Sequence, residues 1–208
     1  GLLVAVLGLA ALELRGGAGE AGRLVLDTRH VTGLGNPVSA VLLVFRGLDT
    51  VFEMLVLLGA FLGARHVALR DVRLGVAIAS YRLPLVGALQ AVIVPLALLV
   101  ALHLLRAGAD DPGGAFQAGA VLAAAGVMLS LTGRLEPQPV AGPAMRAALV
   151  VGTLALAGSG IVALFQGRPL MGLPSKSAIY LIEAAMMVSI GATLALLFSA
   201  SASLRAVR

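Results

Sequence analysis

Three charged side chains, Arg46, Asp49 and Glu53, interrupt an otherwise apolar stretch from Asn36 to Ala64. At about 100° per residue, they point within about 60° of one another on a helix and form one charged stripe. Each such charge costs about 2.5–3.5 kcal/mol near a bilayer centre. Arg46 and Asp49 have the spacing of an ion pair. The stripe either stabilises a buried polar cluster in a helical bundle or lines an ion route or subunit contact. We favour the second interpretation, because ionisable residues inside membranes mark such sites.

The composition predicts a membrane protein. The chain has 208 residues, of which 60% are hydrophobic and 12% charged, and its mean hydropathy is +1.04. Several runs approach the roughly 20 apolar residues that cross a bilayer, so the predicted fold is an all-α polytopic membrane protein with about six transmembrane helices in a loose bundle. The net charge of +5 does not indicate nucleic-acid binding, because the basic residues are spread through the loops.

Hydropathy and turn residues place the expected elements along the chain. The expected spans are residues 1–13, 48–64, 83–105, 115–132, 145–166 and 178–199. Residues 15–35 are Gly-rich and predict a loop. Gly47 predicts a break before the second span, Pro95 predicts a kink in the third, and Gly119 predicts close helix packing in the fourth. The chain opens directly in apolar sequence, so we expect the true N-terminus to lie upstream and the first span to be truncated.

The sequence offers no catalytic constellation. The three histidines lack metal-ligand spacing, and no nucleotide or hydrolase motif is present. The 208 residues contain no cysteine, which excludes thiol chemistry and cysteine-ligated clusters in them. We therefore expect a protein that is not an enzyme and that has no cofactor or metal centre. Glu183 lies about five residues into the last expected span, where a functional and a structural role are equally compatible with the sequence.

The charged stretch resembles a known family. NPVSAVLLVFRGLDTVFEMLVLLGAFLGA is similar to a pattern near the C-terminal end of the large A subunit of Mrp cation/proton antiporters, which also occurs in a small subunit of related membrane-bound hydrogenases. The matching residues are Arg46, Gly47, Asp49, Thr50 and Glu53. Val44 stands where the family usually has Asp, so that carboxylate is lost here.

The rest of the chain resembles the MnhB/MrpB subunit of the same antiporters. RAGADDPGGAFQAGAVLAAAGVMLSLTGR is similar to that family's Pro-Gly-Gly turn and following helix, and IYLIEAAMMVSIGATLALLF to its last helix. The matching residues are Pro112, Gly113, Gly114, Phe116, Gly119 and, in an acidic position, Glu183. Ala109 and Asp110 replace the family's His-Asn pair, and Ala115 replaces its third Gly.

Together the resemblances imply two fused modules. Residues 1–72 correspond to the A-subunit-like part, with two helices, and residues 73–208 to the MnhB/MrpB-like part, with four. The implied function is that of a non-catalytic subunit of a sodium/proton antiporter, with Arg46, Asp49, Glu53 and Glu183 in an ion path or buried charge cluster. The implied partners are other membrane subunits, the lipid bilayer, sodium and protons. The alternative is a purely structural scaffold in a complex that couples redox or carbon dioxide chemistry to ion flow.

The resemblance also implies a location in the bacterial or archaeal plasma membrane. Loops on the side of both termini carry eight Lys and Arg residues and the opposite loops carry six, which predicts cytoplasmic termini.

Overall fold

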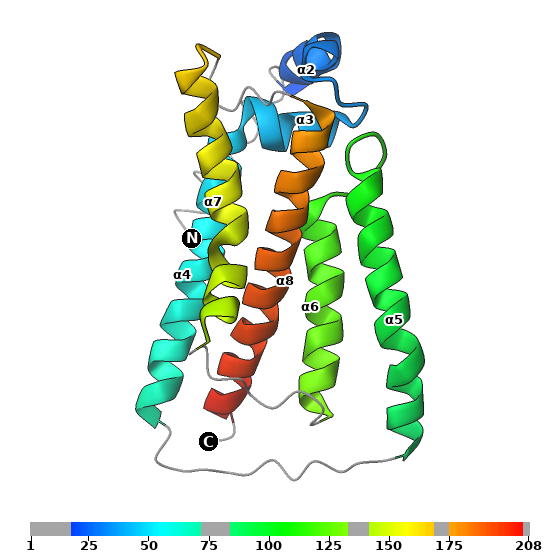
Figure 1. Cartoon of the computed structure of the whole chain (residues 1–208), viewed down its shortest axis with the longest axis vertical. Helices are drawn as coiled ribbons and strands as arrows, with labels where there is room; N and C mark the ends of the chain where they lie inside the picture. Colours follow the sequence, from blue (N-terminus) through cyan, green and yellow to red (C-terminus); the bar gives the residue numbers. More distant parts are fainter. Residues whose placement is uncertain (1–17, 72–83, 133–141, 169–174, 206–208) are drawn as a thin grey trace, which may run out of the picture.

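The computed structural model describes residues 18–71, 84–132, 142–168 and 175–205, and every regular element in them is helical. The elements in chain order are α2 (Ala18–Thr32), α3 (Pro37–Ala40), the π-helix η2 (Val41–Phe45), α4 (Gly47–Asp71), α5 (Pro84–Ala107), α6 (Ala115–Leu131), α7 (Pro143–Phe165) and α8 (Lys176–Arg205). The long helices run side by side, while α2 is seen nearly end-on above them (Figure 1).

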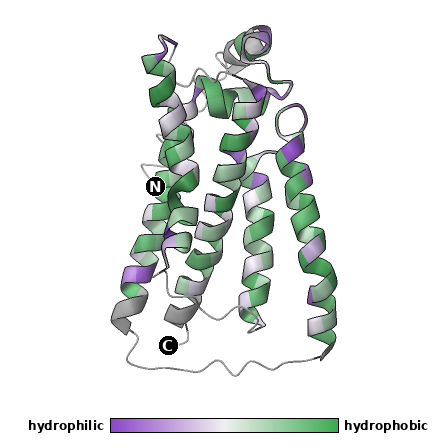
Figure 2. Ribbon diagram, in the orientation of Figure 1, coloured by the Kyte–Doolittle hydropathy of each residue, from purple (hydrophilic) through white to green (hydrophobic). Residues whose placement is uncertain are grey.

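Four of these helices are long and apolar enough to cross a membrane, and α6 is a shorter apolar helix of 17 residues. The spans cover residues 47–67, 85–107, 143–165 and 176–200. Apolar residues cover most of their length, and several of the most polar positions gather near the upper end of the bundle (Figure 2). The predicted all-α polytopic fold is confirmed. The first expected span, residues 1–13, lies outside the described residues.

Helix α8 occupies the middle of the bundle and packs against α4, α6 and α7, while α5 packs on the outer side of α6 (Figure 1). Glycines allow these helices to approach closely. A Cβ atom on Gly119 of α6 would lie 2.8 Å from the Ile190 side chain of α8, and one on Gly152 of α7 would lie 2.6 Å from the Met186 backbone. Small residues are typical of helix contacts in membranes, and the predicted role of Gly119 is confirmed.

The predicted break near Gly47 is present. Helix η2 ends at Phe45, its C-cap residue Arg46 has φ −126° and ψ 32°, and α4 begins at Gly47. The Thr50 hydroxyl donates a hydrogen bond to the Leu42 carbonyl oxygen at 2.6 Å across this break. The short helical segment before α4 is therefore joined to it by a defined turn, which redirects the chain at the charged stripe.

Two boundary predictions are wrong. Residues 15–35 were expected to form a loop, but residues 18–32 form α2, which packs on α3 and ends before Gly33, where φ is +69°. Tertiary packing outweighs the helix cost of its glycines, about 1 kcal/mol each. Helix α4 also continues past Ala64 to Asp71, so the start of the expected connector is helical. The amphipathic piece expected at residues 72–80 lies outside the described residues.

The main hydrophobic core joins both ends of the chain. Leu43 and Met54, from the first expected module, belong to the same buried cluster as Ile182, Met186 and Ile190 of α8. The division into modules 1–72 and 73–208 stays a prediction about sequence organisation, because the packed core crosses it.

Candidate functional site

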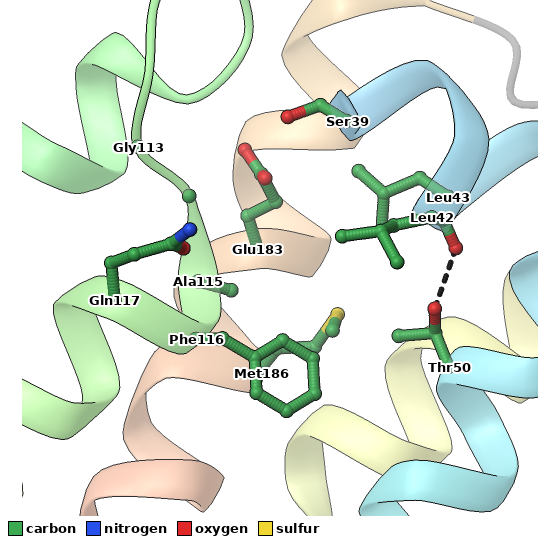
Figure 3. Close-up of a pocket in the computed structure, with 11 residues that line it drawn as sticks. Ser39, Leu42, Leu43, Thr50, Gly113, Ala115, Phe116, Gln117, Glu183 and Met186 are labelled. Carbon is green, nitrogen blue, oxygen red and sulfur yellow. Dashed lines mark hydrogen bonds between the residues drawn. The ribbon is translucent and has the colours of Figure 1, made fainter. Parts of the chain in front are cut away.

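Among the described residues, Glu183 is the most deeply buried ionisable side chain. Only 3% of it is exposed, and its Oε2 atom has no hydrogen-bond partner within the part of the chain that the structure describes. It lines a small cavity, here called the chamber, of about 20 Å³. That volume holds about one water molecule. The other lining residues are Ser39, Leu42, Leu43, Thr50, Gly113, Gly114, Ala115, Phe116, Gln117 and Met186 (Figure 3).

The N-terminus of α6 faces the Glu183 carboxylate. Gly114 is the N-cap residue, and no side chain of its own caps the helix. The backbone N–H of Ala115, in the first turn of α6, lies close to the carboxylate. Unpaired N–H groups give a helix N-terminus partial positive charge, so Glu183 acts as a cap supplied by a different helix. The arrangement favours glycine, because Gly114 has φ +124°, a backbone conformation that residues with a Cβ atom rarely adopt.

Buried Asn36 holds residues 108–114, the turn that precedes α6. Its Nδ2 atom donates to the carbonyl oxygens of Gly108 at 3.0 Å and Asp111 at 2.8 Å. Its Oδ1 atom accepts from the Val38 backbone N–H at 3.0 Å and so caps α3. The Ser39 hydroxyl also donates to the Gly108 carbonyl oxygen. One amide side chain therefore fixes the turn on the segment that forms the opposite wall of the chamber.

An ion pair fastens the same turn to the start of α8. Lys176 Nζ lies 2.6 Å from both carboxylate oxygens of Asp110. Hydrogen bonding to the Lys176 ammonium group lowers the pKa of the Asp110 carboxyl group below its ordinary value of 3.8. Both side chains are exposed, so this pair positions the turn rather than adding much stability.

The charged stripe lines a second, open cavity of about 670 Å³, here called the groove. Arg46 pairs with Asp49 as the spacing predicted, and Glu53 lies on the same face. The Arg46 side chain is 68% exposed and that of Asp49 48%. The rest of the groove is formed by Phe52, Val56, Leu57, Ala60 and Phe116. The described residues therefore gather the three charges in one site but leave it open on one side.

The site residues predicted from the sequence lie in separate parts of the structure. Gly113, Gly114 and Phe116 meet Glu183 in the chamber, whereas Gly119 lies in the contact between α6 and α8, and Pro112 is exposed. The charged stripe belongs to the groove. Phe116 is the one side chain that lines both cavities. The described residues contain no group of three or more His, Asp or Glu residues placed to hold a metal ion.

Asn36, Ser39 and Thr50 were missed as site residues. Asn36 carries a readable signal, because Asn followed by Pro before an apolar run is typical of a helix N-cap. No sequence pattern predicts its hydrogen bonds to residues 108 and 111, because these bonds join segments about 70 residues apart.

Comparison with known proteins finds a matching family and solved structures with a similar fold. Residues 85–200 match the family described as "Domain related to MnhB subunit of Na+/H+ antiporter". No curated protein matches the sequence. A chain of the Mrp complex from Dietzia sp. DQ12-45-1b is similar, with a TM-score of 0.71 and 22% identity. The likeness covers 96% of this chain and 25% of that chain, so this chain spans only a quarter of that relative's length.

A second solved structure has a chain of similar length. It belongs to the membrane-bound sulfane sulfur reductase, described as an archaeal respiratory membrane complex. Its TM-score is 0.73 at 20% identity, and the likeness covers 96% of this chain and 94% of that chain. At these identities the two structures show the shared fold.

Proposed function

The chain belongs to the family of domains related to the MnhB subunit of Na⁺/H⁺ antiporters, and from that premise we propose that it is a non-catalytic subunit that helps form the cation path of a multi-subunit complex. It is a membrane subunit of an Mrp-type, antiporter-like complex. The proposed location is the bacterial or archaeal plasma membrane, with cytoplasmic termini, which the charge bias of the loops supports.

The groove is the observation that carries the proposal. Arg46, Asp49 and Glu53 line it at the start of a helix whose length and composition suit a membrane span. Exposing three charges to lipid is costly, although at the start of a span each costs less than the about 2.5–3.5 kcal/mol that applies near the bilayer centre. A water-filled path or the polar surface of another subunit removes that cost. Carboxylate oxygens are also the ligands that hard cations prefer. Arg46 pairs with Asp49, and Glu53 supplies a second carboxylate along the path.

The second candidate is a scaffold in a complex driven by redox or carbon dioxide chemistry. It is favoured by the likeness to a chain of a respiratory membrane complex over nearly the full length of both chains. In that case the groove is a contact surface for another membrane subunit, and its charges pair with charges on that subunit instead of with a moving ion.

Isosteric removal of the carboxylates separates the two candidates. Glu53→Gln and Asp49→Asn are introduced into the intact complex, with Asp27→Asn, an exposed carboxylate on α2, as the matched control. Sodium-dependent proton exchange is measured in everted vesicles, and assembly is followed on blue-native gels. A role in the path predicts normal assembly with exchange reduced by about tenfold or more, as for loss of a charged group at a site of ion passage.

Loss of the complex from the gels, with any remaining complex exchanging normally, supports the scaffold. If both groove variants assemble and exchange ions like Asp27→Asn, the charges serve neither role and the proposal is wrong.

A further inference from the structure

We propose that the Phe116 ring is a gate between the groove and the chamber, and that the chamber holds a single water-sized guest, a water molecule or a small monovalent cation, against Glu183. This inference rests on the proposed function, because it assumes that the groove is part of an ion path. It adds a binding site, its size limit and the residue that controls entry to it.

The chamber has the features of a binding site. Glu183 Oε2 is buried and has no hydrogen-bond partner among the described residues, so it requires a polar guest. The volume of about 20 Å³ admits one water-sized particle and excludes a hydrated ion. The hydroxyl oxygens of Ser39 and Thr50 also line the chamber, and both donate their protons to backbone carbonyls. Ser39 Oγ also accepts a hydrogen bond from Asn36 Nδ2 at 3.2 Å, so the remaining lone pair of Ser39 and the Thr50 hydroxyl oxygen are available to a guest that donates hydrogen bonds or carries positive charge.

The position of Phe116 makes it the shared wall. The same two helices border both cavities: α4 places Thr50 in the chamber and Asp49 and Glu53 in the groove, and α6 contributes Phe116 to each. The Phe116 ring extends from α6 beside Met186, below the Glu183 carboxylate (Figure 3). On α4, Thr50 and Glu53 point about 60° apart around the helix axis. The chamber and the groove therefore border adjacent parts of the α4 surface.

The surroundings of Phe116 allow it to move. The side chain is half-buried and packs at the margin of the main core, unlike Met186, which is 1% exposed. The groove on its other side is open and far larger than the chamber. Rotation of the ring toward the groove therefore meets free space, and it would connect Glu183 with the carboxylates of the stripe.

Cysteine accessibility tests the gate without relying on transport. The 208 residues contain no cysteine, so Glu183→Cys reports from the chamber and Glu53→Cys from the groove. The assembled complex is treated with Ag⁺, a cation close to Na⁺ in size. Unreacted thiol on this chain is then measured by a maleimide mass tag after denaturation. Ser39→Cys, a conservative change in the same chamber, is the second reporter and decides the result if Glu183→Cys fails to assemble.

A gate predicts a specific pattern of rates. With Phe116 present, the chamber reporter reacts slowly and the groove reporter quickly. Phe116→Ala speeds the chamber reporter by about tenfold or more, because access no longer requires local opening, and leaves the groove reporter unchanged. Met186→Ala, which enlarges the chamber from the α8 side, is the matched control and leaves the chamber reporter slow.

The gate is refuted if the chamber reporter reacts at the same rate with and without the Phe116 ring, or if Met186→Ala speeds it as much as Phe116→Ala. These outcomes are independent of ion exchange. The gate can therefore fail while the groove variants still impair exchange, and the proposed path can fail while the pattern of labelling holds.

Discussion

Replacing Asn36 with Ala should destabilise the chain by about 2 kcal/mol. The change removes the cap of α3, worth about 1 kcal/mol. It also removes the hydrogen bond to the carbonyl oxygen of Asp111, which is exposed in part to solvent and is worth about 1 kcal/mol. The Gly108 carbonyl oxygen keeps the Ser39 hydroxyl as a donor, so it adds little.

A second substitution at the same position separates the two contributions. Asn36→Ser retains a side-chain oxygen that can cap α3 but is too short to reach the turn. It should recover about 1 kcal/mol relative to Asn36→Ala, because only the cap is restored. Val38→Ala is the matched control, because Val38 lies in the same short helix and its side chain is exposed.

The measurement is the free energy of unfolding in mixed micelles titrated with SDS, followed by circular dichroism. The reasoning is refuted if Asn36→Ala is as stable as Val38→Ala, since the bonds from Asn36 to the turn would then contribute nothing. It is also refuted if Asn36→Ser is as stable as the natural chain, since the cap alone would explain the role of Asn36.

Three further predictions concern the turn and the helix contacts. Gly114→Ala should cost about 1–3 kcal/mol, because φ of +124° strains any residue with a Cβ atom, and thermal unfolding measures the loss. Gly119→Leu should force α6 away from α8 and lower assembly on blue-native gels, whereas Gly59→Leu, with open space around it, should not. The lowered pKa of Asp110 means that its pair with Lys176 stabilises the fold above about pH 3.8 and that this contribution is lost as pH falls through the folded-state value. Because the pair is exposed, Asp110→Asn should lower the melting temperature only slightly at pH 7, and the two melting temperatures should converge below pH 3.8; equal melting temperatures at pH 7 would contradict the prediction.

The sequence predicts features that depend on neighbouring residues. The apolar runs, the break before α4 and the pairing of Arg46 with Asp49 all follow from spacing along one segment, and the structure contains each of them. Gly119 was also identified, because a small residue within an apolar helix has few other uses.

The sequence alone did not predict features that depend on contacts between residues far apart along the chain. Glu183 could be placed on a helix, but its burial requires α6 and the segment around Ser39 to meet above it. Helix α2 was missed for a related reason: its glycines favour a loop locally, and only its contact with α3 explains why it is helical.

The chamber shows why the first and last parts of the chain form one working unit. Ser39 and Thr50 come from the first expected module, and Gly114 and Glu183 come from the second. If the two parts were separated, Glu183 would lose one wall of its chamber and the turn before α6 would lose Asn36. Burial removes the Glu183 carboxylate from bulk water at a cost in free energy, and the N-terminus of α6 offsets part of that cost only while the enclosure keeps it in place. The contact between the two parts of the chain is therefore what gives Glu183 its environment, and Phe116, which lines both the groove and the chamber, is where we propose that a guest crosses between them.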